Sequence, residues 1–93
     1  LPPNPKVSQA YQVAAASKVV EKTVMGLKTG ALTAMGAIQE LQKTQMLLVS
    51  EGRTAEAQEV TMALRALQSG DTGQAEKTLM GTALHLEQGK KNT

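Results

Sequence analysis

The chain has almost no aromatic side chains from which to build a core. Phe, Trp and Cys are absent from its 93 residues, and Tyr11 is the only aromatic residue. The other apolar residues are 13 Ala, 11 Leu, 7 Val, 5 Met and one Ile. Small aliphatic side chains favour closely packed helices, whereas sheets favour aromatic and β-branched residues. We therefore expect an all-α protein with a single core, because a chain of this length has no room for two.

Glycines mark the places where helical segments stop. Glycine is favoured just past a helix because it adopts the left-handed conformation without a steric penalty. Four glycines follow segments with apolar residues at spacings of three and four: Gly30, Gly52, Gly70 and Gly89. These segments predict helices at about 5–28, 32–50, 55–69 and 72–88. The connections between them are short, so successive helices should be antiparallel and form a compact four-helix up-down bundle.

The ends of the chain differ in composition from its middle. Residues 1–5 read as a proline-rich linker and helix start, residues 6–89 as the four-helix domain, and residues 90–93 as a tail. The opening run Leu1-Pro2-Pro3-Asn4-Pro5 does not resemble a signal peptide. We expect the chain to be part of a longer protein, joined to it by this stiff linker.

Capping residues precede each predicted helix. Asn4 before Pro5 suits the first start, and Thr33, Thr54 and Asp71 suit the other three. Gln74 lies three residues after Asp71 and is expected to complete a capping box. The segment 52–57 is echoed by 70–75, each with a glycine, a cap and an alanine that is expected to face inward.

Each predicted helix carries one apolar stripe. The second helix also has apolar residues around the rest of its circumference, which is typical of a central helix. Most of the methionines are expected to fill gaps in the core, since no Phe or Trp is available. Gly26, Gly36 and Gly81 fall inside helices, where close helix approach would offset their low helix propensity. The four stripes are Ala10, Val13, Ser17, Val20, Val24 and Leu27; Ala34, Ile38, Leu41, Gln45 and Leu48; Ala57, Val60, Leu64 and Leu67; and Ala75, Leu79, Ala83 and Leu86.

Residues that could carry chemistry are sparse. His85 is the only histidine, and no carboxylate lies three or four residues from it on its helix, so it reads as a lone surface residue. Glu56 and Glu59 read as surface charges that complement a helix dipole. No catalytic residue, metal ligand or cofactor is expected. The net charge of +2 and the lack of aromatic residues among the basic ones do not favour a nucleic-acid partner.

Apolar residues outside the stripes suggest a docking surface. We expect this surface to involve Val19, Met25, Met35, Met46 and Val49. The alternative is that a tight bundle buries all five. The longest apolar run, Met46–Val49, is too short to span a membrane, so no membrane insertion is expected. The compartment stays open, with the cytoplasm slightly favoured.

Part of the second half of the chain resembles a known group of proteins. The stretches 63–71 (ALRALQSGD), 75–79 (AEKTL) and 86–91 (LEQGKK) are similar to a helical region of bacterial von Willebrand factor type A proteins. The likeness covers the third and fourth predicted helices well and the first two only loosely. In that group the helical region follows an α/β domain whose metal site is an Asp-x-Ser-x-Ser motif. This chain contains no such motif, so no metal residue carries over.

The resemblance implies an accessory module whose companion domain binds the ligand. We therefore expect a non-catalytic structural or protein-interaction module that contacts a companion domain of the same chain or another protein. The alternatives are a nucleic-acid-binding or regulatory adaptor and, third, a small enzyme whose site is completed by the rest of the parent protein.

Overall fold

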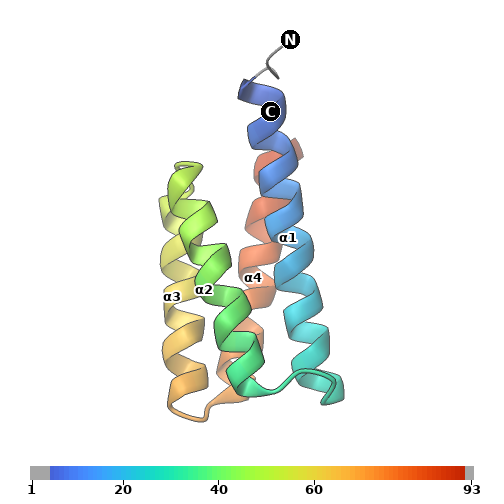
Figure 1. Cartoon of the computed structure of the whole chain (residues 1–93), viewed down its shortest axis with the longest axis vertical. Helices are drawn as coiled ribbons and strands as arrows, with labels where there is room; N and C mark the ends of the chain where they lie inside the picture. Colours follow the sequence, from blue (N-terminus) through green and yellow to red (C-terminus); the bar gives the residue numbers. More distant parts are fainter. Residues whose placement is uncertain (1–4, 92–93) are drawn as a thin grey trace.

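The computed structural model describes the backbone of residues 5–91 and the side chains of residues 11–88. This part of the chain folds into four helices with no strand: α1 (Pro5–Thr29), α2 (Ala34–Ser50), α3 (Thr54–Gln68) and α4 (Thr72–Lys91). The helices alternate in direction around a ring, each packing on its neighbours in sequence, and α1 closes the ring against α4 (Figure 1). The predicted all-α four-helix bundle is confirmed.

The helices differ in length, which makes the bundle long and narrow. Helices α1 and α4 have 25 and 20 residues, whereas α2 and α3 have 17 and 15. The start of α1 therefore extends beyond the connection between α2 and α3 (Figure 1). The molecule measures 45 × 22 × 19 Å. The main contacts of α2 are with α1 and α3. Each helix of the ring packs on two neighbours in this way, so the expectation that α2 is central is wrong.

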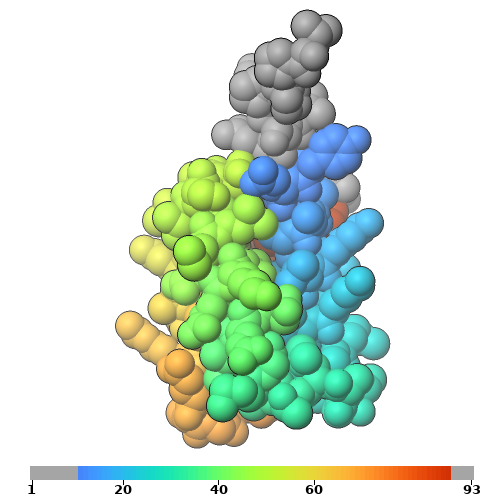
Figure 2. All heavy atoms as spheres, viewed as in Figure 1, coloured from blue at the N-terminus to red at the C-terminus, as the bar shows by residue number. Residues whose placement is uncertain are grey.

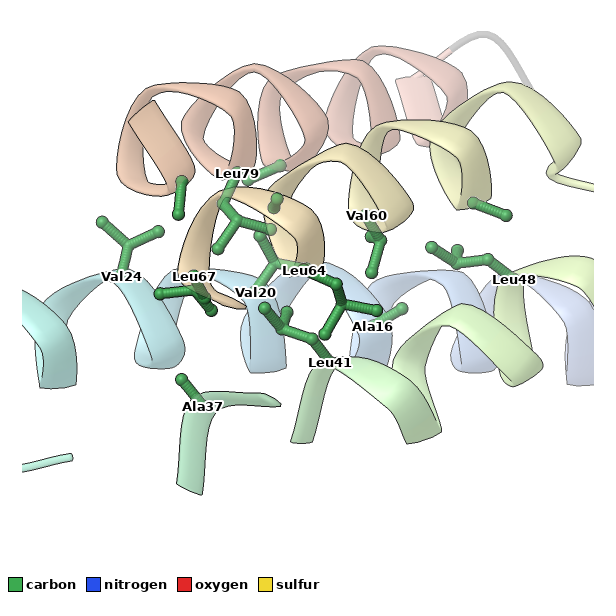
Figure 3. Packing of buried hydrophobic residues seen from close by; sticks show 14 of the residues in the cluster. Ala16, Val20, Val24, Ala37, Leu41, Leu48, Val60, Leu64, Leu67 and Leu79 are labelled. Carbon is green, nitrogen blue, oxygen red and sulfur yellow. The ribbon is translucent and has the colours of Figure 1, made fainter. Parts of the chain in front are cut away.

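The core is a single cluster to which all four helices contribute (Figure 3). The stripes predicted for α3 and α4 are fully buried. On α2 the stripe is rotated: Ala34 is exposed, and Ala37 is buried in its place. Ala10 lies outside the residues whose side chains are described. Among residues 11–88, every buried hydrophobic residue is Ala, Val or Leu: Ala16, Val20, Val24, Ala37, Leu41, Leu48, Ala57, Val60, Ala63, Leu64, Leu67, Ala75, Leu79, Ala83 and Leu86.

The two short connections share one geometry. Gly52 and Gly70 have φ of 75° and 85°, in the left-handed region that favours glycine. The amide after each glycine donates to a carbonyl five residues earlier, Arg53 to Leu48 and Asp71 to Ala66, both at 2.8 Å. These bonds define Schellman motifs. The echo between residues 52–57 and 70–75 is thus a repeated turn.

Two of the expected helix boundaries need correction. Helix α4 continues through Gly89 to Lys91, so the predicted stop at Gly89 and the tail from residue 90 are wrong. Glycine permits a left-handed turn but does not impose one, and no described helix packs back after this position. The linker prediction for residues 1–4, including the Asn4 cap, lies outside the described residues; Pro5 already begins α1.

The structure confirms two of the predicted helix caps and contradicts a third. Thr33 caps α2, its hydroxyl accepting a hydrogen bond from the Gly36 amide at 3.0 Å. Thr54 does not cap α3, because it is the first helical residue and Arg53 holds the cap position. Asp71 caps α4 by accepting from the Gln74 amide at 3.1 Å. The capping box is incomplete, since the Gln74 side chain contacts Thr78 and the Asp71 amide donates to Ala66.

Leu32, in the connection between α1 and α2, lies against two of the three glycines that were predicted inside helices. A Cβ at Gly26 would lie 2.8 Å from Leu32 Cβ, and one at Gly36 would lie 2.9 Å from Leu32 Cδ1. The Leu32 amide also donates to the Gly26 carbonyl at 3.0 Å. Close approach therefore accounts for Gly26, whereas at Gly36 the contact is with the end of the leucine side chain, which can rotate away. Close approach does not account for Gly81, where a Cβ would meet nothing within 4 Å.

Candidate functional site

All five methionines lie on the surface of the bundle. Their side chains are between 54% and 74% exposed, and none belongs to the buried cluster. The expectation that most of them fill the core is therefore wrong. The only aromatic side chain, Tyr11, is also exposed. The five methionines are Met25, Met35, Met46, Met62 and Met80.

The positions of these methionines along their helices direct their side chains away from the core. Met25 and Met80 directly follow the buried Val24 and Leu79, and the other three lie two positions from a buried residue. A step of one or two residues rotates a side chain by about 100° or 200° around the helix axis. Each methionine is thereby turned away from the bundle axis.

Helix α2 gathers the largest share of exposed apolar residues. At 3.6 residues per turn, Met35, Met46 and Val49 lie within about 60° of one another around the axis. They are on the opposite side from the buried residues of α2. Between them lie two exposed glutamines, Gln39 and Gln42. We call these five residues the α2 outer face.

The α2 outer face contains no charged residue. It follows α2 for about 20 Å, since 14 residues separate its first and last members and each adds about 1.5 Å. Helix α2, green in Figure 2, forms the front of the molecule beside α1. The face combines three apolar side chains with two glutamines, and the exposed Lys43 lies at its edge, one turn from Gln39 and from Met46.

The remaining two residues of the expected docking surface are placed differently. Val19 on α1 is half-buried, so it does not offer an open surface. Met25 is exposed but lies on α1 in an open hollow that it lines with Lys18, Glu21 and Lys22. Met35, Met46 and Val49 thus share one face of α2, whereas Val19 and Met25 lie on α1.

A smaller apolar surface lies beside the contact between α1 and α4. Met80 and Leu84, one turn apart on α4, are both more than half exposed. The Lys28 ammonium of α1 lies 3.9 Å from the Met80 sulfur, close enough to donate a weak hydrogen bond. This surface therefore has a cation beside its apolar side chains.

His85 has a partner that the sequence analysis missed. Its Nδ1 lies 2.6 Å from Oε1 of Glu59, which belongs to α3. An ionised carboxylate only accepts hydrogen bonds, so Nδ1 carries the proton and donates it. The search for carboxylates along α4 could not find this contact, because only the packing of α3 on α4 creates it.

The two glutamates of α3 have different partners. Glu56 accepts from the Arg53 guanidinium at 3.0 Å, and Glu59 accepts from His85. No hydroxyl is hydrogen-bonded to His85 in the described part of the chain. Among residues 5–91, no group of three or more His, Asp or Glu side chains could hold a metal ion. The arrangement is that of two separate contacts between side chains, one partly buried between Arg53 and Glu56 and one exposed between His85 and Glu59.

No described helix combines the length and the apolarity needed to cross a membrane. The chain was also compared with protein-family models, with curated proteins and with solved structures. None of the three comparisons found a match.

Proposed function

We propose that the chain is a non-catalytic module that binds another protein domain through the α2 outer face. The observation that carries this proposal is the distribution of methionine: all five are exposed, while the core uses only Ala, Val and Leu among its hydrophobic residues. Five exposed thioethers contribute nothing to the buried cluster. A role in contacts with another molecule accounts for their presence.

The chemistry of the α2 outer face suits a protein partner. Methionine is flexible and polarisable, so it adapts to the shape of an apolar surface, and it is enriched in protein interfaces. Gln39 and Gln42 can donate and accept hydrogen bonds at the same interface. The partner surface is expected to be apolar and largely uncharged, to match a face without charges of its own.

The companion domain is the partner that the resemblance favours. Residues 63–71 and 75–79, which carry most of the likeness to helical regions of bacterial type A proteins, lie on α3, α4 and the turn between them. The α2 outer face is on a different helix, so it is free to contact an α/β domain of the same polypeptide. In this proposal the companion domain binds the ligand and the helical module supports it.

The test is binding of the chain to the type A domain encoded in the same parent polypeptide. The variant Met46→Lys with Val49→Lys places two charges on the α2 outer face and should weaken binding by at least about tenfold. The control is Gln58→Lys with Gln68→Lys, which adds the same charge to exposed positions of α3. The control should bind as the original does, and circular dichroism should show all three proteins equally helical.

Two results would overturn the proposal. One is a folded Met46→Lys, Val49→Lys variant that binds as tightly as the original, which would show that this face does not dock. The other is a parent polypeptide with no type A domain, which would remove the proposed partner.

A further inference from the structure

We infer that the five exposed methionines are separate sites of oxidation by peroxides, and that oxidation of Met35 and Met46 makes the α2 outer face more polar while the bundle stays folded. The inference rests on the proposed function only in its last consequence, the loss of binding. The chemical reactivity and the stability of the fold follow from the positions of the sulfur atoms alone.

The reaction needs only an exposed thioether and a peroxide. A lone pair on Sδ attacks one oxygen of hydrogen peroxide, and an S–O bond forms as the O–O bond breaks. The proton on the attacked oxygen passes, through solvent, to the second oxygen, which leaves as water. Sulfur is oxidised by two electrons and the peroxide is reduced by two. Methionine sulfoxide reductases reverse this modification in cells.

Exposure makes all five sulfur atoms accessible to the oxidant. The side chains of Met35 and Met46 are 67% and 74% exposed, the highest values among the methionines. The chain has no cysteine, so no thiol competes for the peroxide. Met80 is the least exposed and its sulfur lies beside the Lys28 ammonium, which makes it the slowest expected site.

Oxidation should leave the packing of the core unchanged, because no buried side chain among residues 11–88 contains sulfur. Oxidation of a buried methionine places a polar, chiral group among apolar side chains and disrupts packing. Here the sulfoxide oxygens point to water from the surface of the helices. The bundle should therefore keep its helicity and its cooperative unfolding with five sulfoxides in place.

The surface changes most on α2. Met35 and Met46 are two of the three apolar residues of the α2 outer face, and their oxidation leaves Val49 as the only one. The two sulfoxides add two strong hydrogen-bond acceptors to a face whose polar groups were only the amides of Gln39 and Gln42.

The first experiment measures oxidation of the folded protein by hydrogen peroxide. Peptide mass spectrometry should show every methionine oxidised at a rate within about tenfold of that of a free methionyl peptide, as expected for exposed sites. The melting temperature should fall by less than about 4 °C. Protection of Met35 or Met46, or unfolding as oxygen is added, would overturn the inference.

The second experiment measures surface apolarity by retention on a phenyl column, a probe that requires no partner. Peroxide should make the original protein elute earlier. The variant Met35→Leu with Met46→Leu should show less than half of that shift, because leucine has a similar volume and is not oxidised. The matched control, Met25→Leu with Met62→Leu, should shift nearly as the original does.

Equal shifts in the two variants would overturn the assignment to α2. Failure of the proposed function gives a different pattern: the oxidation rates, melting temperatures and retention shifts would be as expected, while the type A domain would bind neither the reduced nor the oxidised chain.

Discussion

Leu84 and Leu86 are two residues apart on α4, yet the first side chain is 56% exposed and the second is completely buried. This pair shows how strictly helical phase decides the role of a residue here. Leu86 contacts the other buried residues of the bundle, whereas Leu84 lies on the outer surface near Met80. The same substitution at the two sites should therefore have very different effects on stability.

Leu86→Ala should lower the free energy of unfolding by about 2–5 kcal/mol, since it removes apolar contacts and leaves a cavity. Leu84→Ala should change it by no more than about 0.5 kcal/mol, the usual range for surface sites. Urea denaturation followed by circular dichroism measures both. Similar losses in the two variants would show that the face of α4 assigned to the core is wrong.

Residues of the α3 and α4 stripes could be predicted from spacing alone, but the buried threonines could not. Thr44 lies between Leu41 and Leu48 at helical spacing, and it is buried because its hydroxyl donates to the Glu40 carbonyl one turn earlier. Spacing of three and four residues from Leu41 and Leu48 fits Gln45 as well as Thr44, and the predicted stripe took Gln45, which is half-buried. Thr23 and Thr82 are buried in the same way, with their hydroxyls bonded to the carbonyls of Val19 and Thr78.

At the scale of helices and their connections, local signals predicted most of what is observed. Gly30, Gly52 and Gly70 all have positive φ, and each ends a helix as expected. Turn chemistry is encoded within a few residues, so it can be read from the sequence. The role of Leu32 could not be predicted, because the contact depends on how the connection folds back over α1 and α2.

Substitution of helical glycines by alanine tests this role of Leu32. Gly81→Ala should raise stability by up to about 1 kcal/mol, because alanine is the better helix former and the added Cβ meets nothing. Gly26→Ala should lower stability despite the same gain in propensity, since its Cβ would lie 2.8 Å from Leu32 Cβ. Thermal unfolding of the two variants measures the opposite signs. Stabilisation by Gly26→Ala would contradict the close packing of Leu32.

At the scale of the molecule, the bundle keeps aliphatic side chains in its core and methionine side chains on its surface. Fifteen buried residues, all Ala, Val or Leu, form the hydrophobic core across four helices, and the five methionines surround it on the outside. The fold class was predictable because composition, spacing and turn signals agree. The position of the methionines was not, since it depends on the phase of each helix relative to the shared axis.

The central claim is that the five methionines do not stabilise the fold and instead provide exposed side chains for contacts with another molecule. The most direct test replaces all five with glutamine, which has a similar helix propensity and cannot substitute for a buried apolar side chain. Equilibrium unfolding in urea should remain cooperative, with a free energy of unfolding within about 2 kcal/mol of the original, as expected for five surface changes. A larger loss, or a chain that no longer unfolds cooperatively, would place methionine in the core and contradict the account.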